Sequence, residues 1–102
     1  MSRAAKLLAI VREENIAIEC ADLGAWSPHE LRAEYDPSGP AIRLNSRVLT
    51  HLPPEEVQRF ITQAVAHELY HHFERTGMQT RLLSRREREA AAEAFARAAM
   101  EE

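Results

Sequence analysis

The residues with the clearest chemical potential lie between positions 66 and 73, where the chain reads AHELYHHF. His67 and His71 stand four residues apart, so on an α-helix they lie about 40° apart in projection and can direct both imidazoles at one point. Glu68 lies between them, about 60° from His71, and can reach a water molecule held there without binding the metal itself. HELYH is a full match to H-E-x-x-H, the pattern in which two histidines bind zinc and the glutamate is a general base.

A catalytic zinc site has three protein ligands and an open position for water, so a third ligand must come from elsewhere in the chain. The last predicted helix offers Glu87, Glu89 and Glu93. Glu87 fits a capping box with Ser84, which leaves the other two glutamates. Glu89 and Glu93 stand four apart and can face the same way, so one can bind zinc while the other accepts an N–H from a ligand histidine. A solvated pair of acidic side chains is the other interpretation of this spacing.

These motifs resemble those of the gluzincins, metallopeptidases in which H-E-x-x-H is followed by a glutamate helix with the pattern E-x-x-x-D. The segment EAAAE at 89–93 matches that pattern with Glu in place of Asp. The chain resembles the ImmA/IrrE group more closely, where a strand ending in asparagine is followed by AHELGHH and then E-x-E-A-N-x-F-A. The corresponding segments here are AIRLN, AHELYHHF and EAAAEAFA. The chain is also similar to the minigluzincins, which are stand-alone gluzincin domains of similar length.

The resemblance implies a zincin-like α+β fold, with residues 1–102 forming a single minimal metallopeptidase domain. An N-terminal helix, a small three-stranded sheet, an active-site helix and a C-terminal glutamate helix are expected. The implied function is peptide-bond hydrolysis in a peptide or protein substrate, through a zinc-bound water activated by Glu68. Glu93 is implied as the acidic partner of a ligand histidine, and the implied zinc ligands are His67, His71 and Glu89.

Two questions stay open at the level of the sequence. The family often continues beyond the position of AAMEE, so the alternative is a latent or non-catalytic zinc-binding module that regulates a partner protein. A donor that stabilises the tetrahedral oxyanion is also expected of such a peptidase. The sequence does not select among five candidates for that donor: His29, Tyr35, His51, Tyr70 and His72.

The N-terminal half must supply the sheet that positions this site. Residues 2–14 carry a partial apolar stripe that predicts a helix. IAIECADL then alternates like a strand, which predicts Ile16, Ile18 and Cys20 on one buried face. LRAEYDPSGPAIRLN reads as a hairpin around the turn-rich DPSGP. Its second strand, AIRLN, is the predicted edge strand that would pair with an extended substrate.

The C-terminal half predicts two helices. The longer one spans 52–77, with Pro54 in its first turn and Gly77 as its stop. His72 lies about 140° round from His67 and is predicted at the surface or beside a ligand, and not as a ligand itself. The last helix begins at Ser84 and runs through an alanine-rich stretch that can pack closely on a neighbour. The apolar ridge of the longer helix consists of Val57, Ile61, Val65, Leu69 and Phe73.

Composition narrows the class of protein. A chain of 102 residues with 45% hydrophobic content is one globular domain's worth. The net charge of −3 disfavours a nucleic-acid partner. The single cysteine excludes an intrachain disulfide, and no signal peptide or membrane-length apolar run is evident. A cytoplasmic location is therefore expected, and a membrane partner is not expected. The oligomeric state is not indicated. A solvated helix edge is predicted for the basic residues that alternate with glutamates, namely Arg81, Arg85, Arg86 and Arg88.

Overall fold

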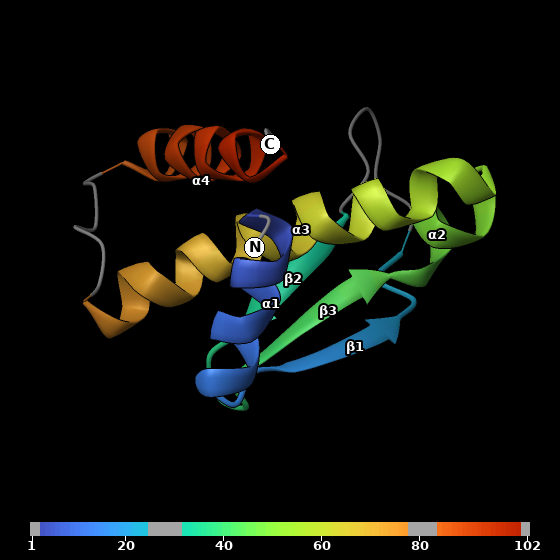
Figure 1. Cartoon of the computed structure of the whole chain (residues 1–102). Helices are drawn as coiled ribbons and strands as arrows, with labels where there is room; N and C mark the ends of the chain where they lie inside the picture. Colours follow the sequence, from blue (N-terminus) through green and yellow to red (C-terminus); the bar gives the residue numbers. More distant parts are fainter. Residues whose placement is uncertain (1–2, 25–31, 78–83, 101–102) are drawn as a thin grey trace.

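The computed structural model describes residues 3–24, 32–77 and 84–100 (Figure 1). The architecture is a mixed α+β one, in which α3 packs against β2 and β3 on one side and against α4 on the other. No helix within the described ranges combines the length and the apolar character that crossing a membrane requires. The elements in chain order are α1 (Arg3–Glu13), β1 (Ala17–Ala21), β2 (Ala33–Asp36), β3 (Ala41–Asn45), α2 (Ser46–His51), α3 (Pro54–Thr76) and α4 (Arg85–Ala99).

The three strands form one sheet in the order β1-β3-β2. β2 and β3 pair antiparallel, which confirms the predicted hairpin, and β1 pairs parallel to β3. AIRLN is therefore the central strand, and the prediction that it is an edge strand was wrong. β2, the first strand of the hairpin, pairs with one side of β3, and β1 pairs with the other side. The edge strand next to α3 is β2.

The two faces of the sheet differ in burial. Ile42 and Leu44 are 0% and 2% exposed, on the face that α3 covers. Ile18 and Cys20 pair with these two residues and so share their face, yet Ile18 is 39% exposed and Cys20 is exposed as well. The prediction of a buried face is confirmed for Ile16, which is 6% exposed, and was wrong for Ile18 and Cys20, because β1 is the edge strand on which α3 does not pack.

The opposite face of the sheet carries Arg43 among three carboxylates. Its guanidinium lies 3.2 Å from Glu19, 3.2 Å from Glu34 and 2.8 Å from Asp36. Glu19 and Glu34 are the direct neighbours of Arg43 on β1 and β2. This ion-pair network lies on the face of the sheet away from the core, and it holds the Glu34 carboxylate on that face.

The long helix α3 begins and ends as predicted. Pro54 is in its first turn, and Gly77 closes it in the left-handed conformation with φ of 82°. A non-glycine residue adopts this conformation rarely. Val65, Leu69 and Phe73 of the predicted ridge are buried, whereas Val57 and Ile61 are only partly buried. The ridge is thus fully covered over the half of the helix that carries the histidines.

The last helix is capped by Ser84, whose Oγ accepts a hydrogen bond from the backbone N–H of Glu87 at 3.0 Å, as predicted. Ala92 and Ala96 are 0% exposed and allow close packing of α4 in the core. Phe95 contacts the rings of Tyr70 and Phe73 on α3, at centroid distances of 5.7 and 6.0 Å. This packing fixes the glutamates of α4 relative to the histidines of α3.

A short helix that the sequence analysis did not predict, α2, follows β3 directly. Asn45 caps it by accepting a hydrogen bond from the backbone N–H of Arg47. The same side chain, which is 0% exposed, also accepts from Leu23 N–H and donates to the carbonyl of Gly24. Asn45 therefore joins the end of β3 to the segment after β1.

Candidate metal centre

Two histidines of α3 and one glutamate of α4 come together at the face of the long helix. His67 Nε2 lies 3.0 Å from one carboxylate oxygen of Glu89, and His71 Nε2 lies 3.2 Å from the other. One ligand atom from each residue falls within 4.8 Å of the others, which is close enough to bind a metal ion. Because α3 and α4 pack along each other, residues 22 positions apart in sequence meet here.

The second nitrogen of each imidazole faces another glutamate. His71 Nδ1 lies 2.8 Å from Glu74 Oε1, which is hydrogen-bond distance. His67 Nδ1 lies 3.6 Å from Glu93 Oε2, which is within ion-pair range and longer than a hydrogen bond. With Nδ1 as the protonated nitrogen, the Nε2 lone pair of both rings is directed at one point, as metal binding requires.

Glu74 was missed by the sequence analysis. It stands three residues after His71, a spacing that makes the two side chains neighbours on a helix and could have identified it. Its side chain is only 6% exposed. Oε2 is buried and has no hydrogen-bond partner in the described part of the chain. A buried carboxylate with one free oxygen is costly, and such groups are typical of functional sites.

Glu68 lies next to the histidine pair in a largely buried position. The residue is 9% exposed, and Oε2 is 4.0 Å from His67 Nε2. Burial raises the pKa of Glu68 to about 8, with smaller contributions from the negative charges of Glu89, Glu34 and Glu93. A carboxyl group whose pKa lies near neutrality is suited to accept and return a proton.

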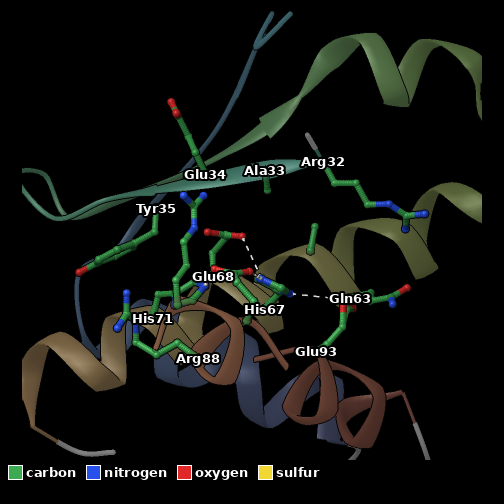
Figure 2. A pocket seen from close by; sticks show the side chains of 13 residues that line it. Arg32, Ala33, Glu34, Tyr35, Gln63, His67, Glu68, His71, Arg88 and Glu93 are labelled. Carbon is green, nitrogen blue, oxygen red and sulfur yellow. Dashed lines mark hydrogen bonds and ion pairs between the residues drawn. The ribbon is translucent and has the colours of Figure 1, made fainter. Parts of the chain in front are cut away.

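The site opens into a cleft of about 740 Å³ between β2 and the two helices (Figure 2). β2 forms one wall above His67 and His71, and α4 contributes the opposite wall. The lining residues are Arg32, Ala33, Glu34 and Tyr35 around β2, Gln63, Ala64, His67, Glu68 and His71 on α3, and Arg85, Arg88, Glu89 and Glu93 on α4.

His72 was predicted at the surface or beside a ligand, and the first of these is wrong, because the residue is 3% exposed. Its Nδ1 hydrogen-bonds the hydroxyl of Tyr35 at 2.6 Å, and its Nε2 lies 3.0 Å from Glu14 at the end of α1. His72 thus lies where α3 meets β2 and the end of α1. It is a buried residue that joins three elements, and it is not part of the His67–His71–Glu89 cluster.

The prediction of a solvated helix edge holds for Arg85 and Arg86, which are both exposed, whereas Arg88 is partly buried. Arg85 and Arg88 also line the cleft, which the sequence analysis did not predict. Arg81 lies outside the described residues.

The five candidates for an oxyanion donor are now separated by their positions. Tyr35 lines the cleft, and its hydroxyl is bonded to His72. Tyr70 is 8% exposed and packs on Phe95, and His51 is exposed on α2. His29 lies outside the described residues.

Comparison with known proteins adds no neighbour to this description. Family models, curated proteins and solved structures were compared with the chain, and none of them matches it. What the chain does must therefore be inferred from the site itself.

Proposed function

We propose that this chain is a zinc-dependent metallopeptidase of the gluzincin type. The observation that carries the proposal is the convergence of His67 Nε2, His71 Nε2 and the Glu89 carboxylate beside the buried carboxylate of Glu68. Two imidazoles and one carboxylate, with a general base next to them, form the donor set of a hydrolytic zinc site. The resemblance of HELYH and EAAAE to gluzincin motifs supports the same function.

Zinc fits this donor set better than a hard cation does. Calcium and magnesium prefer six or more oxygen ligands, whereas imidazole nitrogen suits zinc. His67, His71 and Glu89 would hold the ion, and three protein ligands are the number that a catalytic zinc site uses. When bound, zinc supplies a Lewis acid that polarises a carbonyl and lowers the pKa of a water molecule to about 7.

The residues of the chain provide the rest of the chemistry. Glu68 accepts the proton of the attacking water and returns it to the leaving amine. A cation at the histidine pair would lower the pKa of Glu68 from its metal-free value of about 8, because the cation favours the ionised carboxylate. Glu74 holds the His71 imidazole through Nδ1, and Glu93 faces Nδ1 of His67 at ion-pair distance.

The substrate is a peptide that pairs with β2. Among the described residues, this strand pairs with β3 alone, and residues 32–35 line the cleft above the histidines. Addition of a strand to a free sheet edge is a common mode of peptide recognition, because it uses main-chain hydrogen bonds. The peptide bond would then pass over Glu68 and the histidine pair. A cytoplasmic location remains part of the proposal.

Substitution of Glu68 separates this function from the latent or non-catalytic zinc-binding module. The zinc-loaded wild type should cleave an unfolded protein substrate. Glu68→Gln should retain zinc and lose cleavage, because the amide keeps the shape of the side chain and cannot accept the proton. A matched control is Glu55→Gln, the same change at an exposed position on the same helix. If the zinc-loaded wild type cleaves nothing, the chain is the non-catalytic module.

A further inference from the structure

Three arginines line the cleft, and they are distributed over both of its walls. Arg32 precedes β2, and Arg85 and Arg88 lie in the first half of α4. Arg32 and Arg85 are exposed, and Arg88 is partly exposed. A substrate entering the cleft therefore meets guanidinium groups from two separate elements.

The glutamates that line the same cleft each lie close to another side chain of the protein. Glu89 and Glu93 face the imidazoles at 3.0 and 3.6 Å, and Glu68 is buried beside them. Glu34 pairs with Arg43 at 3.2 Å, and its side chain points away from the cleft (Figure 2). The positive charges on the walls come from these arginines, whereas the half-exposed Glu89 and Glu93 carry negative charge at the histidine pair, where a bound metal ion would offset it.

The arginines also lie on both sides of the histidine pair. The guanidinium of Arg32 lies 5.9 Å from the ring of Phe60, which is seven residues before His67 on α3. Seven residues are about two helical turns. Arg88 lies toward the other end of the pair, because it also lines a smaller hollow together with His71 and Glu74. A chain crossing the site passes positive charge before and after the histidines.

We infer that the cleft selects peptides that carry acidic side chains on both sides of the bond to be cut. This inference rests on the proposed peptidase function and names its substrate class. Arginine provides bidentate donors for carboxylates, and charges along a cleft raise the rate of encounter with an oppositely charged ligand. Arg32 selects on one side of the bond, and Arg85 and Arg88 select on the other.

An acidic peptide fits these features better than a nucleic acid does. The edge of β2 that pairs with no other described strand offers backbone N–H and C=O groups, which match an extended peptide. Nucleic-acid binding usually relies on a basic surface that neutralises many phosphates, and three arginines beside four glutamates form no such surface.

The test uses two peptides of equal length that differ only in the residues flanking a common central sequence, aspartate and glutamate in one and lysine in the other. The zinc-loaded wild type should cleave the acidic peptide with a kcat/KM about tenfold higher or more. This preference should shrink as ionic strength rises from about 0.1 M to about 1 M, since the Debye length falls from about 10 Å to about 3 Å.

Charge-reversal variants assign the preference to the cleft. Arg32→Glu and Arg85→Glu should each lower kcat/KM for the acidic peptide by about threefold to tenfold and raise it for the basic peptide. Arg86→Glu is the matched control, because it makes the same charge change next to Arg85 at an exposed position that does not line the cleft. Circular dichroism of each variant verifies folding.

A binding measurement keeps the inference distinct from the peptidase proposal. Fluorescence anisotropy of the labelled peptides with zinc-loaded Glu68→Gln reports selection without cleavage. Tighter binding of the acidic peptide that depends on Arg32 and Arg85 upholds the inference even if no bond is cut. Equal affinity for both peptides, an equal effect of Arg86→Glu, or tighter binding of a single-stranded oligonucleotide at the same salt concentration would overturn it.

Discussion

Replacement of Glu74 should weaken zinc binding while leaving the chain folded. Glu74 Oε1 accepts the Nδ1–H of His71 at 2.8 Å, and this contact sets the ring orientation that directs Nε2 toward Glu89. The side chain is 6% exposed, so water does not replace it easily. Removing it allows the His71 ring to rotate and to protonate at either nitrogen, and both changes compete with metal binding.

The size of the effect follows from this contact. Loss of a carboxylate that orients a ligand histidine typically lowers metal affinity by about 10- to 100-fold, or about 1.4 to 2.8 kcal/mol. We expect Glu74→Leu to lie at the upper end of this range, because the contact is short and buried. Glu74→Gln keeps an acceptor oxygen and loses the charge, so a loss of about tenfold or less is expected.

Metal-free stability should change in the opposite direction. Glu74 Oε2 is buried without a hydrogen-bond partner in the described residues, and an unpaired buried polar atom costs stability. Leucine has a similar size and carries no charge, and Glu74→Leu should raise the free energy of unfolding of the metal-free chain by about 1 kcal/mol. A residue that only supported the fold would give losses in both quantities.

Two measurements test this prediction. Zinc affinity is obtained by competition with a chromophoric chelator, and metal-free stability is obtained from urea unfolding. Nitrogen-15 NMR of the metal-free protein reports which imidazole nitrogen of His71 carries the proton. The reasoning is refuted if Glu74→Leu binds zinc within threefold of the wild type, or if its loss is no larger than that of the exposed control Glu55→Gln.

Three further outcomes are expected. Tyr35→Phe removes the 2.6 Å hydrogen bond to buried His72 and should lower the free energy of unfolding by about 1–2 kcal/mol in urea, with zinc affinity unchanged in the chelator competition. Hydrogen bonds from Ser38 and Arg43 lower the pKa of Asp36 from 3.8 to about 2. The ionised form therefore stabilises the fold above pH 4, and this contribution is lost as pH falls through about 2. Asp36→Asn should reduce the change in thermal midpoint between pH 5 and 2. Burial raises the pKa of Glu68 in the metal-free chain to about 8. The free energy of unfolding should therefore fall as pH rises from about 4.5 through about 8. Urea unfolding of Glu68→Gln should show a flatter pH dependence.

The site was more predictable from the sequence than its surroundings. His67 and His71 lie on one helix, where a spacing of four fixes their relative position, and EAAAE is a motif of the same local kind. Local periodicity also located α3 and its stop at Gly77. Glu89 contacts both histidines because α3 and α4 pack together, with Ala92 and Ala96 of α4 buried.

Glu74 and α2 are local features that were overlooked, whereas the wrong predictions about β1, β3 and His72 concern contacts between residues far apart in the chain. Alternation in β1 predicts which residues share a face, but it does not show that the strand lies beyond the helices, where Ile18 stays exposed. The order of strands likewise depends on the parallel pairing of β3 with β1, two strands that are far apart in the sequence, and no local pattern encodes this pairing. His72 is buried by partners 37 and 58 positions away, so its helical face alone could not reveal its environment.

The central claim is that His67, His71 and Glu89 form a zinc site, and zinc analysis of the purified chain tests it most directly. After purification without chelators and removal of free metal, the wild type should hold about one zinc ion per chain. Glu89→Ala should lose it, whereas Glu87→Ala, on the same helix and outside the cluster, should retain it. A wild type that binds no zinc, or a Glu89→Ala variant that binds it as tightly as the wild type, would contradict the account.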